Sequence, residues 1–245
     1  MGTETLLTLD PIAPRITHVV AAAVIDAGGH ILIAQRLAGK HLAGGWEFPG
    51  GKLEPGEARV AGLARELREE LGIAIRDPRP LMRVRHTYPE GEVLIDMWVV
   101  TRYTGNPEGL DGQVLRWLDQ DELERTEMLP ADRPIGRALR LPERLIEPST
   151  TAYTLVESTF RRRNPAVDGN AGERTRLVGI LCNDHEEALH AATRNDSDFL
   201  ALRGVLANRE LAALCDSVPV PVFARGIELE QAWALGASGC NEIGS

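Results

Sequence analysis

Cysteine is scarce in this sequence, which has only Cys182, Cys215 and Cys240 among its 245 residues. The three are odd in number and widely spaced, and they form neither a CxxC pair nor a zinc-ligand spacing. This pattern excludes a disulfide framework and favours small buried side chains in a reducing compartment.

Long apolar runs are also missing. No stretch approaches the roughly 20 apolar residues that a membrane-spanning helix requires. The opening segment, MGTETLLTLDPIAPR, carries acidic residues where a signal peptide would be basic. We therefore expect a cytoplasmic protein that has no membrane partner.

Basic residues are outnumbered, since 27 Lys and Arg face 36 Asp and Glu and leave a net charge of −9. Binding to polymeric nucleic acid depends on neutralising phosphates with Lys and Arg, so this balance disfavours such a partner. A small anionic substrate remains compatible, because local arginines and a bound metal can reverse the local field. The 43% of hydrophobic residues is typical of a well-packed globular protein.

The first 147 residues predict alternating strands and helices. Residues 16–25 and 30–35 are apolar and rich in β-branched side chains, and the glycine turn between them predicts a hairpin. Residues 58–71 are predicted to form a helix that stops at Gly72, because apolar residues recur at three- and four-residue spacing. Further strands are predicted at 81–88, 92–103 and 114–118, and a second helix at 134–141. Together they predict an α/β/α sandwich around a mixed sheet.

A domain boundary is predicted near Pro148, so that residues 1–147 form one domain and residues 148–245 a second. The second part has a polar segment at 160–176 and otherwise alternates strand and helix patterns. The strands are predicted at 152–157, 177–181, 199–202 and 220–223, and the helices at 185–194, 209–215 and 228–235. Such alternation predicts parallel strands with right-handed crossovers.

The most informative segment is GKLEPGEARVAGLARELREELGI, which runs from Gly51 to Ile73. Within it, Glu66, Glu69 and Glu70 stand at positions i, i+3 and i+4, so their carboxylates share one face of the predicted helix. A solvated acidic face is the alternative interpretation. Mg²⁺ favours oxygen ligands and combines carboxylates with substrate phosphates, so this face predicts a Mg²⁺ site, with Mn²⁺ as the other candidate ion.

This segment resembles the signature of the Nudix family of pyrophosphohydrolases at all of the specified positions. These are Gly51, Glu57, Arg65, Glu66, Leu67, Glu69, Glu70, Gly72 and Ile73. The resemblance implies a Nudix fold that cuts a phosphoanhydride bond with a bound cation. It also implies that Glu66, Glu69 and Glu70 are metal ligands and that the Gly50 carbonyl adds another oxygen.

Three further residues of the motif are expected to support it. Arg65 and Glu57 are expected to pair and orient the loop, although a plain surface ion pair is the alternative. Gly51, together with Gly50, permits the tight loop before the helix.

The reaction also needs a carboxylate that acts as base or orients the attacking water. Glu66, Glu69 and Asp111 are the candidates, and the sequence does not separate them. Asp111 stands where relatives carry a longer glutamate that is a metal ligand or base, and a turn-forming Asp before Gly112 is the other interpretation.

Other positions resemble the MutT branch of this family, which hydrolyses 8-oxo-dGTP to the monophosphate and pyrophosphate. The resemblance implies substrate contacts by Arg36, His41, Phe48 and Lys52, although Arg36 and His41 are equally well explained as surface residues. Asp132 stands where that branch has an asparagine that reads the purine edge. An ionised Asp132 would repel guanine O6 unless it is protonated, and the alternative is that it caps the following helix.

The second part resembles the C-terminal half of thiamine phosphate synthase, a (β/α)₈ barrel, in Val178-Gly179-Ile180, residues 198–202 and residues 220–227. A full barrel needs about 200 residues, and the early strands are missing. We therefore expect an incomplete barrel-like domain without synthase activity. Because parallel sheets need both faces covered, it is expected to dock on the first domain or on a second copy.

The leading hypothesis is a Mg²⁺-dependent 8-oxo-dGTP diphosphatase that sanitises the nucleotide pool and thereby spares DNA repair. Its partner would be a small nucleotide substrate, and the chain would be a monomer or a homodimer. One alternative is a Nudix pyrophosphohydrolase of other nucleoside triphosphates or nucleoside diphosphate derivatives. Another is a nucleotide-sensing regulatory protein, which the intact glutamates disfavour because a sensor need not keep a base.

Overall fold

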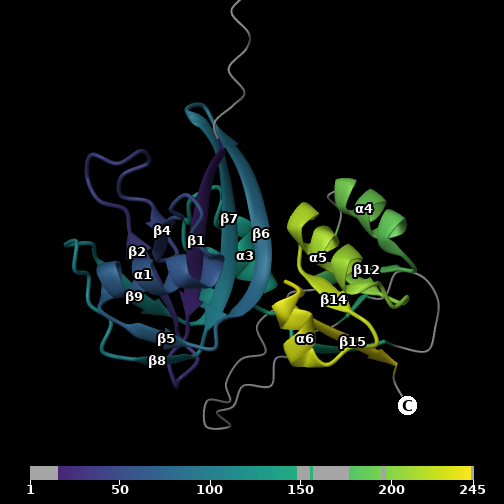
Figure 1. Cartoon of the computed structure of the whole chain (residues 1–245). Coiled ribbons are helices and arrows are strands. Elements are labelled where there is room, and N and C mark those ends of the chain that lie inside the picture. Colours follow the sequence, from purple (N-terminus) through teal and green to yellow (C-terminus); the bar gives the residue numbers. More distant parts are fainter. Residues whose placement is uncertain (1–15, 148–154, 157–176, 195–196, 244–245) are drawn as a thin grey trace, which may run out of the picture.

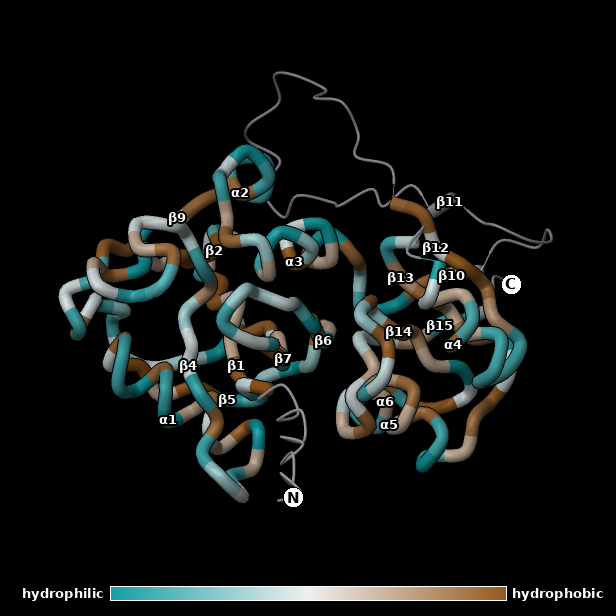
Figure 2. The backbone as a smooth tube through the Cα atoms, turned by 90° about the horizontal axis from the view of Figure 1, so that it is seen from above, coloured by the Kyte–Doolittle hydropathy of each residue, from teal (hydrophilic) through white to brown (hydrophobic). Residues whose placement is uncertain are grey.

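The computed structural model describes residues 16–147, 155–156, 177–194 and 197–243. Within these ranges two bodies lie side by side, an N-terminal body of residues 16–141 and a C-terminal body that begins at Arg144 (Figure 1). Figure 2 shows the same division from above. In this described part, every helix is too short or too polar to cross a lipid bilayer.

The N-terminal body is built around a four-stranded mixed sheet in the order β4-β1-β7-β6. β1 runs parallel to β7 and antiparallel to β4, and β7 runs antiparallel to β6. These strands are β1 (Ile16–Val24), β4 (Gly50–Lys52), β6 (Arg79–Tyr88) and β7 (Gly91–Val100). Smaller sheets join β2 (Ile31–Gln35) to β3 (Trp46–Glu47) and β9 (Leu115–Leu118), and β5 (Ala74–Arg76) to β8 (Arg102–Thr104).

The predicted hairpin of the first two strands is wrong. The turn itself is tight, because the Asp26 carboxylate accepts hydrogen bonds from the backbone N–H groups of Gly28 and His30 at 2.8 Å each. After a bridge between Ile25 and Ile31 the strands diverge into different sheets. β1 has β4 on one edge and β7 on the other, so neither edge is left for β2.

Alternate residues of β1 face opposite layers and so confirm the predicted α/β/α sandwich. Val20, Ala22 and Val24 pack in one cluster with Leu63, Leu67 and Leu71 of helix α1 (Arg59–Leu71). Ala21 and Ala23 point the other way, into a cluster that includes residues of α2 (Gln120–Arg125) and α3 (Arg133–Ala138). The period of two along the strand produces this division.

Helix α1 ends as predicted but begins without local stabilisation. Gly72 ends it in the left-handed conformation, with φ of 69°. At the other end Ala58 occupies the N-cap position without a side-chain hydrogen bond, and the first turn has no acidic residue. A capping Ser, Thr, Asp or Asn would stabilise such an end by about 1 kcal/mol. The start of α1 therefore depends on contacts with other elements.

The C-terminal body confirms an open, barrel-like parallel sheet. Strands β12, β13, β14 and β15 are neighbours in chain order and parallel, and β11 joins antiparallel to β12. Their bounds are β11 (Leu155–Val156), β12 (Leu177–Cys182), β13 (Phe199–Leu202), β14 (Val222–Ala224) and β15 (Gly239–Ile243), with helices α4 (His185–Thr193), α5 (Asn208–Ser217) and α6 (Leu229–Ala234) between them. The predicted polar segment at 160–176 lies outside the described residues.

One strand of the predicted first domain belongs to the sheet of the second. β10 (Arg144–Glu147) pairs in parallel with β15, so it belongs to the sheet of the C-terminal body. Its four residues are too few to show a period, and the pattern therefore missed it. The division into domains at residue 148 stays a prediction, and the sheet favours a boundary a few residues earlier.

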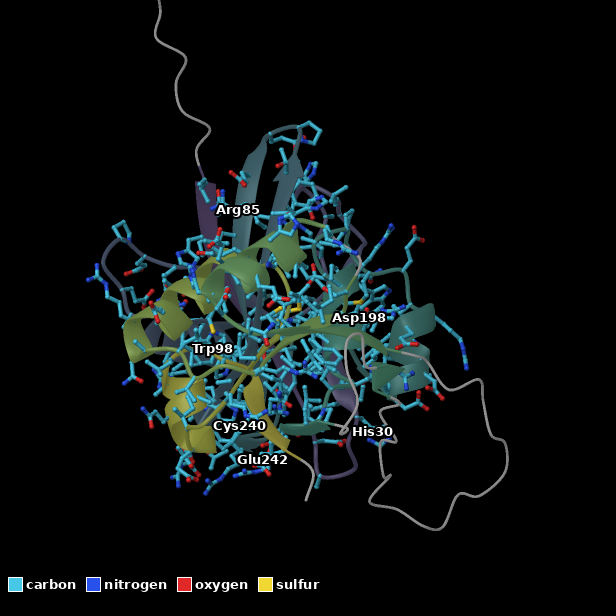
Figure 3. The ribbon with its side chains drawn as sticks, turned by 90° about the vertical axis from the view of Figure 1, so that its right-hand side faces the viewer. His30, Arg85, Trp98, Asp198, Cys240 and Glu242 are labelled. Atoms are coloured by element: carbon cyan, nitrogen blue, oxygen red, sulfur yellow. The ribbon has the colours of Figure 1, made fainter. Side chains whose placement is uncertain are left out.

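The C-terminal body covers the edge strand β6 of the N-terminal body (Figure 1). The pairing of β6 with β7 shifts register between Pro80 and Met82, and the carbonyl of Leu81 there accepts a hydrogen bond from the buried Ser238 hydroxyl. Farther along the interface, Asp198, labelled in Figure 3, takes two hydrogen bonds of 2.8 and 2.9 Å from Arg137 of α3. Docking on the first domain, one of the two expected arrangements, is what the structure shows.

Candidate active site

A recess in the N-terminal body brings together five of the predicted site residues from four parts of the chain. Arg36 follows β2, Phe48 and Gly50 come from the β3–β4 segment, Glu70 from the last turn of α1, and Asp111 from the loop before β9. The sequence pattern did not single out Gln35, Lys40, Glu47 and Gln113, which also line this recess. The recess is thus lined by cationic, carboxylate and aromatic groups.

Glu70 is the motif glutamate that reaches the recess. Its Oε2 accepts a hydrogen bond of 3.1 Å from the Gly50 N–H. Burial, helped by the neighbouring charges of Glu66 and Glu47, raises the pKa of this carboxyl to about 7 against the lowering effect of the Gly50 N–H. A cation would relieve both the burial and the repulsion, because opposite charge favours the ionised form.

Two glycines let β4 pass directly over the carboxylates of α1. A Cβ atom at Gly51 would lie only 2.1 Å from Oε2 of Glu66, and one at Gly50 would lie 2.1 Å from the Val20 carbonyl oxygen. Gly50 also has φ of 150°, a conformation that residues with side chains rarely adopt. A side chain at Gly51 would push β4 away from α1, and one at Gly50 would push it away from β1.

Arg65 makes the predicted pair with Glu57 and extends it to two predicted metal ligands. Its Nε and Nη2 donate to the two carboxylate oxygens of Glu57 at 3.0 and 2.9 Å. Its Nη1 donates to Glu66 at 2.8 Å and to Glu69 at 3.2 Å. Hydrogen bonding from Arg65 lowers the pKa of the partly buried Glu57 carboxyl. The loop before α1 and two of its glutamates therefore share one guanidinium.

Replacing Arg65 with lysine is expected to lower kcat/KM roughly tenfold, because partners that orient metal ligands typically contribute tenfold to a hundredfold. A lysine ammonium keeps the charge but lacks the planar fork that holds both oxygens of Glu57. The measurement is steady-state kinetics beside Arg68→Lys, since Arg68 is exposed on the same helix. Equal kinetics for the two variants would contradict an orienting role.

The carboxylates are suited in kind to a divalent cation, but their predicted convergence is not seen. Glu66 and Glu69 turn toward Arg65, whereas Glu70 turns toward Gly50. Across the described ranges, no three His, Cys, Asp or Glu side chains are gathered as a metal cluster. Three carboxylates on one helix face, with Asp111 across the recess, nevertheless form the oxygen donor set that hard cations prefer.

Asp111 lies in a turn, as one interpretation predicted, and also in the wall of the recess, where its role as metal ligand or base stays a prediction. Its N–H donates to the Gln113 side-chain oxygen at 2.9 Å, and Gln113 Nε2 donates to the Glu70 carbonyl at 3.1 Å. Gly112 follows with φ of 86°. These contacts fasten the Asp111 loop to the end of α1.

Arg36 presents an unused donor next to the recess. Its Nη1 donates to Glu47 at 2.5 Å, while its buried Nε has no acceptor in the described part of the chain. Burial raises the pKa of Glu47, and the attraction of Arg36 opposes that effect. A phosphate oxygen is the kind of acceptor that would satisfy such a donor. The sequence signal for Glu47 was its place between Trp46 and Phe48, inside the segment that carries the resemblance.

Besides Asp132, which is described below, two predicted substrate contacts lie outside the recess wall. His41 is exposed, and its Nδ1 lies 3.3 Å from Oε1 of Glu90, with its ring edge-on to Tyr88 at 5.5 Å. Lys52 is exposed on β4, and its carbonyl accepts a hydrogen bond of 3.1 Å from Arg65. The structure therefore does not bring their side chains to the other site residues.

Asp132 is buried behind Phe48 rather than capping α3. Only 5% of Asp132 is exposed, and its Oδ1 accepts a hydrogen bond of 3.3 Å from the Phe48 N–H. It makes no side-chain hydrogen bond to α3, so the helix-cap interpretation is wrong. Burial raises the pKa of this carboxyl to about 7, against the lowering effect of the Phe48 N–H.

The raised pKa of Asp132 predicts a specific dependence of stability on pH. The folded state holds this proton up to pH of about 7, whereas the unfolded chain releases it near 3.8. Between those values the folded state binds more protons, so stability falls as pH rises and then levels off above pH 7. The total loss of unfolding free energy over this pH range is about 4 kcal/mol. The melting temperature of Asp132→Asn should therefore rise relative to that of the wild type as the pH increases from 4 to 7. A constant difference between the two melting temperatures would contradict this.

Comparisons with known proteins match the N-terminal body. The sequence profile of the NUDIX domain matches residues 20–138. The 8-oxo-dGTP diphosphatase of Escherichia coli K12 is 32% identical over 122 residues, which cover 49% of this chain and 95% of that protein. The CTP pyrophosphohydrolase of the same strain is 37% identical over 119 residues, 49% of this chain and 88% of that protein. The solution structure of the E. coli ORF135 protein matches 53% of this chain and 93% of its own, with 34% identity and a TM-score of 0.47.

Proposed function

Since this chain belongs to the Nudix family of hydrolases, we propose that its N-terminal body hydrolyses 8-oxo-dGTP to 8-oxo-dGMP and pyrophosphate, a step of nucleotide-pool sanitation. The relative from E. coli K12 named 8-oxo-dGTP diphosphatase supports this substrate. The recess supports it chemically, because it combines cationic groups with carboxylates and one buried aromatic ring.

The observation that carries the proposal is a three-residue segment whose first and last backbone N–H groups each donate a hydrogen bond to a carboxyl. The Phe48 N–H holds Asp132, and the Gly50 N–H holds Glu70. Two residues of chain span at most about 7 Å, so the two carboxyls are held close to one another. This segment thus holds Asp132, which is suited to reading a base, near Glu70, which is suited to holding a cation.

We propose Mg²⁺ as that cation, held by Glu66, Glu69 and Glu70 with the Gly50 carbonyl. When bound, such an ion neutralises phosphoryl oxygens and lowers the pKa of a bound water. The other steps belong to side chains of this chain. Arg36 binds phosphate through its unused donor, and Glu66, Glu69 or Asp111 takes the proton of the attacking water.

Asp132 is proposed to read the base in its protonated form. A protonated carboxyl donates one hydrogen bond and accepts another, as an asparagine amide does. It can therefore donate to guanine O6 while its second oxygen accepts from a ring N–H. Its pKa of about 7 keeps a substantial protonated fraction at neutral pH.

CTP is the second candidate substrate, and the relative named CTP pyrophosphohydrolase favours it. A protonated carboxyl also complements cytosine, because that base offers N3 as acceptor beside an amino donor. Asp132 alone therefore suits both bases.

The test is Mg²⁺-dependent turnover of 8-oxo-dGTP, dGTP and CTP side by side, with products identified. A kcat/KM for 8-oxo-dGTP that is at least about a hundredfold above the other two, with pyrophosphate released, would support the proposal. Preference for CTP would replace it with the second candidate. Turnover of none of the three would sink both substrate assignments.

A further inference from the structure

The C-terminal body reaches helix α1 through one aspartate. Asp216 stands near the C-terminal end of α5, and its Oδ1 lies 3.2 Å from Nη1 of both Arg59 and Arg83. The backbone carbonyl of Asp216 also accepts a hydrogen bond of 3.1 Å from Arg83. Both arginines belong to the N-terminal body, so Asp216 is bound from across the interface.

The same arginines continue the contact into the central sheet. Asp96 of β7 is 5% exposed, and its Oδ1 accepts hydrogen bonds from Arg83 Nε at 2.7 Å and from Arg59 at 3.4 Å. Its Oδ2 is bound by the His18 ring. Two aspartates, one from each body, thus balance two arginines, and Asp96 alone would leave an excess of positive charge beside the sheet.

Arg59 is the first residue of α1, the end that lacks a local cap. A positive charge there opposes the helix dipole, whose N-terminal end is itself positive. The partners of Arg59 are therefore what offsets this charge and holds the first turn. Glu66 to Glu70 follow seven to eleven residues later on the same helix, about 10 to 17 Å along its axis.

We propose that Asp216 is a positioning residue of the hydrolase site. It acts through Arg59, fixing the start of α1 and with it the placement of the motif glutamates over the recess. The C-terminal body on this view completes the N-terminal one instead of merely adjoining it. The inference rests on the proposed function only for its kinetic readout.

The test compares Asp216→Asn, Arg59→Gln and the double variant in the full chain. Asp216→Asn is expected to lower kcat roughly threefold to tenfold with KM within about twofold, because displacement of catalytic groups acts on the reacting geometry. Arg59→Gln is expected to lower kcat at least as much. Asp216→Asn should then add nothing further in the double variant, since its effect passes through Arg59.

Ser238→Ala is the matched control, because Ser238 bonds the carbonyl of Leu81 across the same interface without contacting α1. It is expected to lower the melting temperature while leaving kcat near that of the wild type. Equal loss of kcat in Asp216→Asn and Ser238→Ala would overturn the proposal, since loosened docking alone would then explain both.

Hydrogen exchange supplies a readout that needs no substrate. Amides of residues 62–65, the first in α1 with an acceptor inside the helix, should exchange roughly threefold to tenfold faster in Asp216→Asn and unchanged in Ser238→Ala, because only the first variant frees the start of α1. Unchanged exchange together with unchanged kcat would overturn the proposal. If the wild type turns over none of the nucleotides, the proposed function fails, while the exchange rates still decide on Asp216.

Discussion

Glu70→Gln is expected to lower kcat by at least about a thousandfold, because it removes a carboxylate that the cation and the phosphates both require. The amide oxygen can still accept from the Gly50 N–H, so the strand over the helix should remain in place. Steady-state kinetics at saturating Mg²⁺ measure the loss. Binding of Mn²⁺, followed by electron paramagnetic resonance, should weaken in parallel.

The fold itself should not suffer from this change. Burial raises the pKa of Glu70, so its ionised form costs the folded state free energy above that pKa, and a neutral glutamine removes the cost. The melting temperature without metal should therefore be equal or higher at pH 8. Glu54→Gln, with the same loss of charge on an exposed loop residue, should match the wild type in kcat. A Glu70→Gln enzyme within tenfold of the wild type would refute the assigned role.

The second large effect is expected at Asp132. Asp132→Ala should lower kcat/KM for 8-oxo-dGTP by about a hundredfold, because a buried site built to hydrogen-bond a base loses its partner and leaves the Phe48 N–H unpaired. Asp132→Asn keeps one donor and one acceptor and should retain most of the activity. Kinetics with 8-oxo-dGTP and CTP on the three proteins measure both effects.

The pH profile separates base reading from a purely structural role. In the wild type, kcat/KM should fall as pH rises through about 7, since the ionised carboxylate cannot donate to guanine O6. Asp132→Asn should lack this fall, because an amide does not titrate. Identical profiles for both proteins would mean that Asp132 does not read the base.

The local part of the site could be predicted from the sequence. Periodicity and spacing were sufficient for the glutamate face of α1 and its end at Gly72, and the resemblance to the family motif added the Glu57–Arg65 pair. The structure added that Arg65 also engages Glu66 and Glu69. That choice among several carboxylates depends on side-chain rotamers, which a spacing does not encode.

Long-range contacts could not be predicted in the same way. The partner of Asp132 is the backbone of Phe48, 84 positions away in the chain, and no helix or strand period links them. The sequence also gave Asp132 a second plausible role as a cap, which its burial excludes. No sequence pattern pointed to Asp216, because its contacts with Arg59 and Arg83 form only where the two bodies meet.

In the C-terminal body, the order of elements was predicted better than their limits. The alternation of strands and helices was correct, because β12, β13 and β14 are short apolar runs such as Phe199–Leu202. β15 and β10 were missed, since one is interrupted by polar residues such as Asn241 and the other has only four residues. The resemblance to thiamine phosphate synthase stays a hypothesis.

The pairing of β10 with β15 also determines how late this part of the sheet can form and where the chain can be shortened. Arg144 lies opposite Cys240, so this ladder joins positions 96 residues apart, and it can form only after β15 has been synthesised. Contacts of such separation are slow to form. A truncated chain that ends at residue 147 would keep β10 with no sheet to join, and its unpaired backbone groups would recruit strands of other molecules. Ending the chain just before Pro142 avoids that aggregation-prone tail.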